Sequence, residues 1–173
     1  MEHFEPITVS PASTFSWRNL QWVCTNCNRH KGNRPTAAER LLMIDPTMVD
    51  PWAFLTLDEA TGLVAARYED GALDACGEFT LRVLTPLTEE GVITGRERAI
   101  TSLRSAVSAV QTDPSDFEAR RAFRAAVQKD DYGVSAWFAL WEGARSEPFA
   151  ALRRDCPAVW RRFVAWTLAS RLG

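Results

Sequence analysis

Long apolar runs are missing from this sequence of 173 residues, and their absence excludes one large class of protein. Crossing a bilayer takes roughly 18 or more consecutive apolar residues, and no run here approaches that length. The N-terminus has no charged start followed by an apolar stretch, which is the pattern of a secretory signal peptide. We therefore expect a cytoplasmic protein with no membrane segment.

A strong excess of one charge is also missing. The formal net charge is -2 at pH 7, so the chain as a whole is not a polycation built for nucleic acid. Between residues 17 and 40, however, basic side chains greatly outnumber the single acidic one. These basic residues are Arg18, Arg29, Lys31, Arg34 and Arg40, against Glu39 alone. Such a local excess is typical either of a surface that contacts phosphates or of a solvated face.

Internal repeats and low-complexity segments are absent as well, which excludes a solenoid and a disordered chain. The length allows one ordinary core, or a small motif followed by a helical domain. Tryptophan, by contrast, is abundant, with seven residues, and we expect most of them to be buried or partnered.

Cysteine is scarce, but two of the four cysteines form a Cys-x-x-Cys pair at Cys24 and Cys27. In a cytosolic protein, such a pair indicates metal binding or redox chemistry before it indicates a disulfide. The residues around it do not form a thioredoxin-like βαβ pattern, which argues against the redox interpretation. Cys76 and Cys156 are isolated.

The first part of the chain predicts the order strand, loop, strand, helix. The expected elements are a strand at 2–6, a loop at 7–16, a strand at 20–23 and a helix at 24–31 ended by Gly32 and Pro35. We also expect a short helix at 36–43, turns at 45–46 and 50–51, and a strand at 62–68.

Beyond about residue 77 the apolar spacing becomes helical. The expected helices cover 79–84, 88–111, 113–129 and 134–144, with a last one after Pro157. The fold class that follows is α+β and mostly helical, with a small N-terminal motif packed on a C-terminal helical domain. We predict the boundaries 1–46 for the motif, 47–76 for a connecting segment with short strands, and 77–173 for the helical domain.

The N-terminal motif has the side chains that phosphodiester hydrolysis requires. His3 is suited to be the general base, because its unperturbed pKa lies near working pH. Glu2 and Asn28 each offer a hard oxygen to a divalent ion such as Mg²⁺ or Mn²⁺, which keeps water and phosphate as its other ligands. Asn19 can fix the imidazole of His3 through a side-chain or backbone contact. Lys31 and Arg29 can bind flanking phosphates.

Several short motifs resemble one known family. They are Glu-His-Phe-x-Pro at 2–6, Trp-x-Asn-Leu at 17–20, Cys-x-x-Cys-Asn-x-x-Lys-Gly at 24–32 and Ile-Asp-Pro at 44–46. Together they are similar to the HNH nucleases of the ββα-metal fold, and most like the HNH subunits of retron-type and Septu-type anti-phage systems. The resemblance implies a metal-dependent endonuclease acting on DNA or RNA, the nuclease effector of a bacterial defence system.

Carried over to this sequence, the resemblance makes His3 the general base, Asn19 the middle Asn, and Glu2 and Asn28 the metal ligands. Arg18 and Arg34 then join Arg29 and Lys31 as contacts to the nucleic-acid backbone. Zinc-bearing relatives place a second Cys-x-x-Cys before the catalytic His, so that four thiolates hold a structural Zn²⁺. Here Cys24 and Cys27 supply half of such a site, with Cys76, Cys156 and His30 as the remaining candidate ligands.

A second interpretation comes from a different class of protein. The motif can be a catalytically weak or inactive HNH-like module whose Trp-rich helical half binds a partner subunit, such as an ATPase. Cleavage of nucleic acid that depends on His3 distinguishes the two interpretations.

Overall fold

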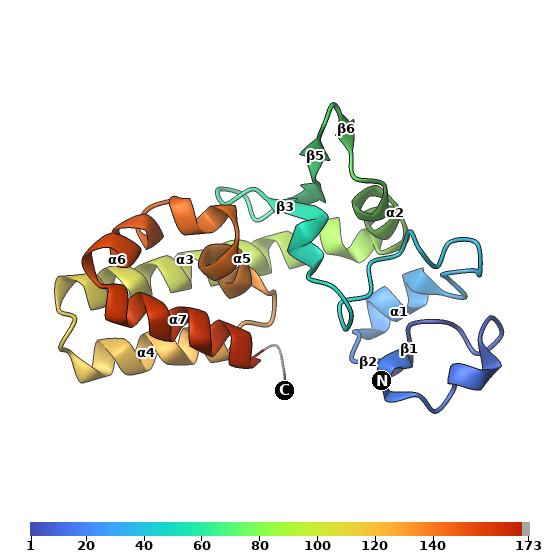
Figure 1. Ribbon diagram of the computed structural model, residues 1–173, viewed down its shortest axis with the longest axis horizontal. Coiled ribbons are helices and arrows are strands. Elements are labelled where there is room, and N and C mark those ends of the chain that lie inside the picture. Colours follow the sequence, from blue (N-terminus) through green and yellow to red (C-terminus); the bar gives the residue numbers. More distant parts are fainter. Residues whose placement is uncertain (171–173) are drawn as a thin grey trace. The chain divides into compact units, whose positions relative to one another are not determined.

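A computed structural model describes residues 1–170 of this chain, and it is mostly helical with small two-stranded sheets. The chain forms two compact units. The N-terminal unit contains residues 1–58 and 63–93, and the helical unit contains residues 59–62 and the chain from 94 onward. Figure 1 shows the elements of both units, coloured along the sequence. The α+β class expected from the sequence is thus confirmed.

The N-terminal unit begins with two strands and a helix. Strand β1 (Glu2–His3) pairs antiparallel with β2 (Leu20–Gln21), and helix α1 (Thr25–Lys31) follows. Both strands are shorter than predicted. The N–H of Phe4 still donates to the backbone carbonyl of Asn19 at 2.8 Å. Pairing stops there, because the N–H of Glu5 bonds to the side chain of Asn19 and Pro6 has no N–H to offer.

Two further hairpins and a helix complete this unit. Strand β3 (Leu55–Leu57) pairs with β4 (Val64–Ala66), and β5 (Tyr68–Glu69) pairs with β6 (Ala72–Leu73). The predicted strand at 62–68 is therefore divided between two hairpins. Helix α2 (Ala75–Val83) packs on β4 at Gly77, where a Cβ would lie 2.5 Å from the carbonyl oxygen of Phe54. Short 3-10 helices cover 11–13, 17–19, 51–53 and 85–88.

The core of the N-terminal unit joins the first strand to α2. Phe4, at the end of β1, is buried against Met43, Phe79 and Val83. The backbone N–H of Ile44 donates to the buried hydroxyl of Thr80 at 2.9 Å. These contacts hold the ββα segment against the rest of its unit.

The helix predicted at 36–43 does not form, and the segment consists of turns. Its backbone has a single i to i+4 hydrogen bond, from Met43 to Glu39. Leu41 is exposed, so the apolar pattern is not buried on a helix face. Without such burial, a helix of eight residues is too short to offset the free-energy cost of helix nucleation.

The helical unit is built around aromatic side chains. Helix α3 (Glu90–Thr112) starts in the N-terminal unit and continues into this one, followed by α4 (Phe117–Gln128) and α5 (Val134–Leu140). Helix α6 (Phe149–Asp155) and helix α7 (Pro157–Ser170) then follow a 3-10 turn at 142–145. Helix α7 packs against α4, α5 and α6, and Phe163 on it contacts Phe123 and Phe149 at centroid distances of 5.1 and 5.9 Å.

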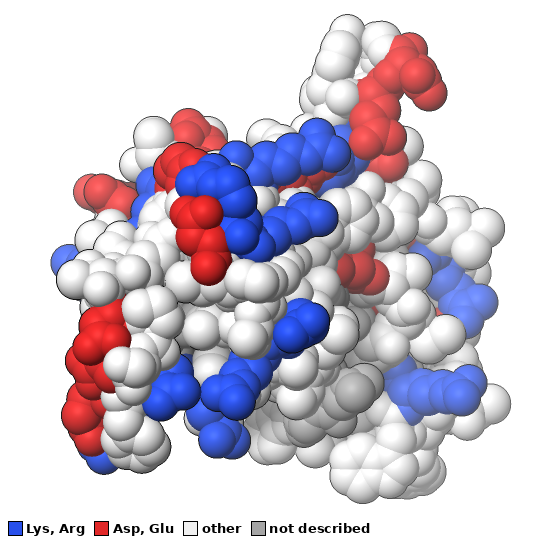
Figure 2. Space-filling view, turned by 60° about the vertical axis from the view of Figure 1, so that its left-hand side comes forward, with Lys and Arg blue, Asp and Glu red and all other residues white. Residues whose placement is uncertain are grey.

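The long helices α3 and α4 confirm the predicted ones closely, whereas the helix predicted at 134–144 stops at Leu140. Within residues 1–170, no helix combines the length and apolar character needed to cross a bilayer. Basic side chains on the face seen in Figure 2 occur singly and in small groups, several of them beside acidic ones.

Candidate functional site

The imidazole of His3 is held by a backbone carbonyl. Its Nε2 lies 2.8 Å from the carbonyl oxygen of Thr14, in the loop between β1 and β2. Because a carbonyl oxygen can only accept, Nε2 carries the proton of the neutral ring. Nδ1 is then the unprotonated nitrogen, and it lies 3.9 Å from Oε1 of Glu2. The neutral His3 therefore has a nitrogen ready to accept a proton beside the Glu2 carboxylate.

Asn19 closes the loop that carries Thr14. Its buried side-chain oxygen accepts from the N–H of Glu5 at 2.7 Å, and its amide donates to the carbonyl oxygens of Glu5 and Ser13 at 3.1 and 3.2 Å. The contact to Ser13 fixes the residue next to Thr14. Asn19 thus orients His3 through the neighbouring backbone, because its side chain bonds to the loop and not to the imidazole.

Glu2, Asn28 and Lys31 meet beside His3. The pKa of the Glu2 carboxyl is lowered, first by the hydrogen bond it accepts from the N–H of His3 at 2.8 Å. The side-chain amide of Asn28 and the positive charge of Lys31 lower the pKa of Glu2 further, against partial burial. Lys31 is only 6 % exposed, and burial lowers its own pKa while Glu2 opposes that change. The sequence analysis predicted that Lys31 contacts phosphate, and in the structure the ammonium group of Lys31 lies near the Glu2 carboxylate.

The spacing of Asn28 and Lys31 explains how α1 contributes to this cluster. Residues three apart on a helix lie on the same face, so both side chains project toward β1. Cys24 caps the N-terminus of α1, because its sulfur accepts from the N–H of Cys27 at 3.2 Å. Gly32, with φ of 54°, caps the C-terminus. Glycine adopts a positive φ more easily than other residues, so the helix ends directly after Lys31.

Glu2 and Asn28 fit one hydrated divalent cation. The side-chain amide of Asn28 lies close enough to the Glu2 carboxylate to lower its pKa. Turning that amide over would present its oxygen to an ion held by Glu2. Both residues are partly exposed, which leaves room for water and a phosphate oxygen. Within the described chain, no three His, Cys, Asp or Glu side chains gather as a metal site. The donor set is therefore two hard oxygens, which suits Mg²⁺ or Mn²⁺.

The cysteine pair lies at the start of α1. Cys24 is exposed, and the hydrogen bond from the N–H of Cys27 lowers the pKa of its thiol. Burial is the main reason that the pKa of Cys27 is raised to about 11. Of the other candidate zinc ligands, Cys156 lies in the helical unit at the end of α6, and the remaining two have other partners. Cys76 donates to the carbonyl of Leu41, and His30 bonds to Thr85.

The predicted phosphate contacts differ in their surroundings. Arg18 and Arg29 are exposed, and Arg29 donates to the side chain of Asn26 at 2.9 Å. Arg34 forms an ion pair with Glu39 and lies 6.0 Å from the centre of the Phe79 ring. Of these three arginines, Arg34 is the one whose charge is paired with a carboxylate.

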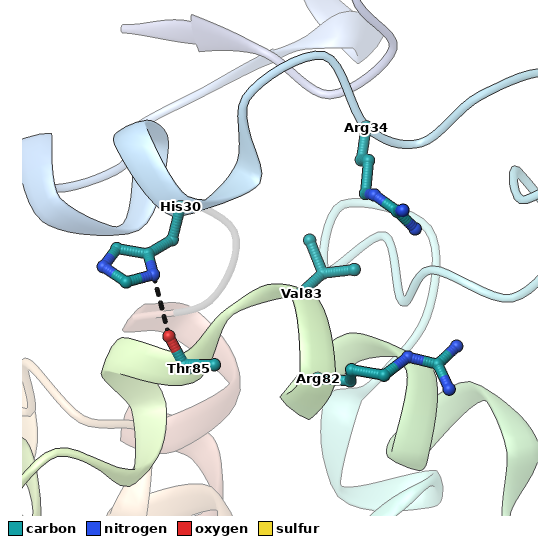
Figure 3. A pocket seen from close by; sticks show the side chains of 5 residues that line it. All are labelled: His30, Arg34, Arg82, Val83 and Thr85. Carbon is teal, nitrogen blue, oxygen red and sulfur yellow. Dashed lines mark hydrogen bonds between the residues drawn. The ribbon is translucent and has the colours of Figure 1, made fainter.

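A small cavity of about 260 Å³ lies elsewhere on α1 (Figure 3). It is lined by His30, Arg34, Arg82, Val83 and Thr85. The Nδ1 of His30 lies 2.8 Å from the hydroxyl of Thr85. His30 is two residues after Asn28, so the two side chains project roughly 200° apart around the helix. The cavity is therefore not part of the cluster around Glu2 and His3.

Three aromatic side chains of the N-terminal unit are exposed, two of them tryptophans. They are Phe15, Trp17 and Trp22, which are 95, 78 and 85 % exposed. The other tryptophans described are buried or half-buried, as expected. The sequence did not single out these three, because aromatic content alone does not distinguish a core residue from a surface one. The sequence feature that could have indicated their exposure is that they lie outside the helical segments with periodic apolar residues.

No protein-family model, curated protein or solved structure matches this chain. The assignment of a function therefore depends on the geometry of the site and on the resemblance of its motifs.

Proposed function

We propose that the N-terminal unit is a metal-dependent HNH endonuclease centre that hydrolyses phosphodiester bonds in DNA or RNA. One observation carries the proposal: Glu2 lies beside His3, Asn28 is close enough to Glu2 to lower its pKa, and the imidazole is oriented by the Thr14 carbonyl. A general base and two hard oxygens in one place are what a one-metal nuclease needs. The resemblance of the motifs to HNH subunits of retron-type and Septu-type systems supports a role as the nuclease effector of anti-phage defence.

In this mechanism, Nδ1 of His3 accepts the proton of the attacking water. The Nε2–H continues to donate to Thr14, so the carbonyl dipole stabilises the imidazolium as it forms. Asn19 acts as a positioning residue, because it holds the backbone next to Thr14. The exposed Arg18 and Arg29 bind phosphates on either side of the scissile bond.

Glu2 and Asn28 would hold a divalent ion through their oxygens. When bound, this ion stabilises negative charge on the phosphate and on the leaving oxygen. Lys31 balances the Glu2 carboxylate from the helix side and adds positive charge near the phosphate.

The decisive experiment measures cleavage of plasmid and single-stranded DNA by the full chain with Mg²⁺ or Mn²⁺. His3→Ala removes the base, and we expect the rate to fall about 10²- to 10⁴-fold. His30→Gln is the matched control. It changes the other histidine of the chain, which lies on the side of α1 that does not carry Asn28. Asn28→Asp keeps a metal-binding oxygen and should retain activity that Asn28→Ala loses.

Cleavage that survives in His3→Ala with the wild-type rate would reject the assigned base. A wild-type protein that never cleaves, while remaining folded by circular dichroism, would instead favour the inactive module that binds a partner such as an ATPase.

A further inference from the structure

Phe15, Trp17 and Trp22 form the feature that the proposed chemistry leaves unused. We refer to them as the aromatic platform. Exposed apolar side chains that gather in one patch mark binding sites, whereas single ones need no explanation. All three lie in the N-terminal unit within eight residues of chain, from Phe15 to Trp22.

Each ring of the aromatic platform is close in sequence to a residue that bonds within the site. Phe15 follows Thr14, whose carbonyl holds the imidazole of His3. Trp22 follows Gln21, the strand partner of Glu2. Trp17 begins the 3-10 helix 17–19, which contains the buried Asn19. Along the chain, Phe15 and Trp17 thus precede β2 and Trp22 directly follows it.

The backbone under the platform is held in place. The N–H of Ser16 donates to Ser13 at 3.1 Å, and the N–H of Asn19 donates to Ser16 at 2.9 Å. The amide of Asn19 also bonds to Ser13 at 3.2 Å. The rings therefore project from an ordered segment, so a ligand does not have to order the loop on binding.

Basic residues near the platform in the sequence favour a negatively charged ligand. Arg18 is exposed between Trp17 and Asn19, and Arg29 is exposed on α1. Exposed aromatic rings among basic side chains are the arrangement that binds single-stranded nucleic acid, with bases stacked on rings and phosphates on the charges. In a duplex the faces of the bases are covered by their neighbours, so they cannot stack on protein rings.

We propose that Phe15, Trp17 and Trp22 stack on unpaired bases, so that the substrate class of this site is single-stranded nucleic acid. The inference rests on the proposed function only in placing the scissile phosphate at His3. The stacking itself does not require catalysis. It therefore makes a binding prediction that can be measured with the reaction stopped.

The test titrates the full chain with a fluorescein-labelled oligo(dT) and with a duplex of equal length, in EDTA. We expect tighter binding of the single strand, and a loss of about fivefold or more in that affinity for Trp17→Ala and for Trp22→Ala. Trp22→Phe, which keeps a ring, should bind nearly as the wild type does. Phe117→Ala is the matched control, because Phe117 is 66 % exposed on α4 of the helical unit.

Three outcomes would overturn the proposal. The first is equal affinity for single strand and duplex, and the second is unchanged affinity in both tryptophan variants. The third is self-association of the wild type in sedimentation velocity that Trp17→Ala and Trp22→Ala abolish without affecting oligo(dT) binding, because the rings would then join two copies of the chain. Single-strand binding without any cleavage in Mg²⁺ would reject the proposed nuclease function and leave the stacking proposal standing.

Discussion

At the residue scale, the charge of Glu2 depends strongly on the folded surroundings. The hydrogen bond from the His3 N–H, then Asn28 and Lys31, lower the pKa of this carboxyl. A lowered pKa means that the folded state favours the carboxylate. Glu2 therefore stabilises the fold above the pKa of an unfolded Glu, roughly 4.3, and this contribution is lost as the pH falls through the lower folded value.

This dependence predicts the pH profile of a charge-removing variant. Glu2→Gln should melt at a lower temperature than the wild type at pH 7, and the two should converge as the pH falls below about 4. Thermal unfolding followed by circular dichroism from pH 7 to pH 3 measures both curves. Glu90→Gln, an exposed change in the same unit, is the control. A constant difference across the range would contradict the assigned pKa shift.

The two thiols at the start of α1 should differ in reactivity. The lowered pKa of exposed Cys24 and the raised pKa of Cys27, about 11, mean that at neutral pH Cys24 supplies most of the thiolate. Iodoacetamide at pH 7.5 should therefore label Cys24 well before Cys27, as peptide mass spectrometry can show. Cys24→Ser should remove the fast phase, and a fast phase that survives would contradict the prediction.

At the element scale, the packing of α2 on β4 depends on Gly77. A Cβ there would lie 2.5 Å from the Phe54 carbonyl oxygen and 3.0 Å from the Cβ of Ala66. We expect Gly77→Ala to destabilise the chain by about 1–3 kcal/mol, because backbone must move to admit the methyl group. At Gly91 nothing lies within 4 Å of the added Cβ, so Gly91→Ala should be neutral or slightly stabilising in chemical denaturation.

Elements differ in how far the sequence predicts them, for physical reasons. The helical spacing of Ile100, Leu103 and Val107 is visible in the sequence and correctly predicts the long helix α3, in which all three are buried. Strands of two or three residues have too few positions for a period, so β3 and β6 were missed. The helix predicted at 36–43 was wrong for another reason, because the fold leaves Leu41 exposed. The side chains of the candidate site came from motif spacing, whereas the Thr14 carbonyl has no signature in the sequence.

At the scale of the whole molecule, the helical unit depends on its aromatic core. Phe163 is fully buried and contacts Phe123, Phe149 and Trp160. Phe163→Ala should lower the free energy of unfolding by about 3–5 kcal/mol, a large part of the roughly 5–15 kcal/mol typical of a protein. The exposed Arg162→Ala on the same helix should stay within about 0.5 kcal/mol of the wild type. Urea unfolding of both variants measures the difference.

The net charge makes a second prediction for the whole molecule. Because the formal charge is -2, binding of oligo(dT) must come from the local basic residues and not from a general attraction. The logarithm of the affinity should fall linearly with the logarithm of the salt concentration, and Arg18→Gln should reduce that slope by about 0.7. An unchanged slope would show that Arg18 contacts no phosphate.

The Asn19 side chain has a consequence for chain entropy. It ties Glu5 to Ser13 and so divides the excursion of residues 4–19 into smaller closed loops. The entropy lost on closing a flexible loop grows only as the logarithm of its length, about 0.6 kcal/mol for each doubling. Ile7 and Thr8 are exposed inside the first of these loops. An inserted peptide between them would lengthen a closed loop at little entropic cost, and the backbone bonds it would interrupt are those from Val9 and Ser10 to the carbonyl of Pro6.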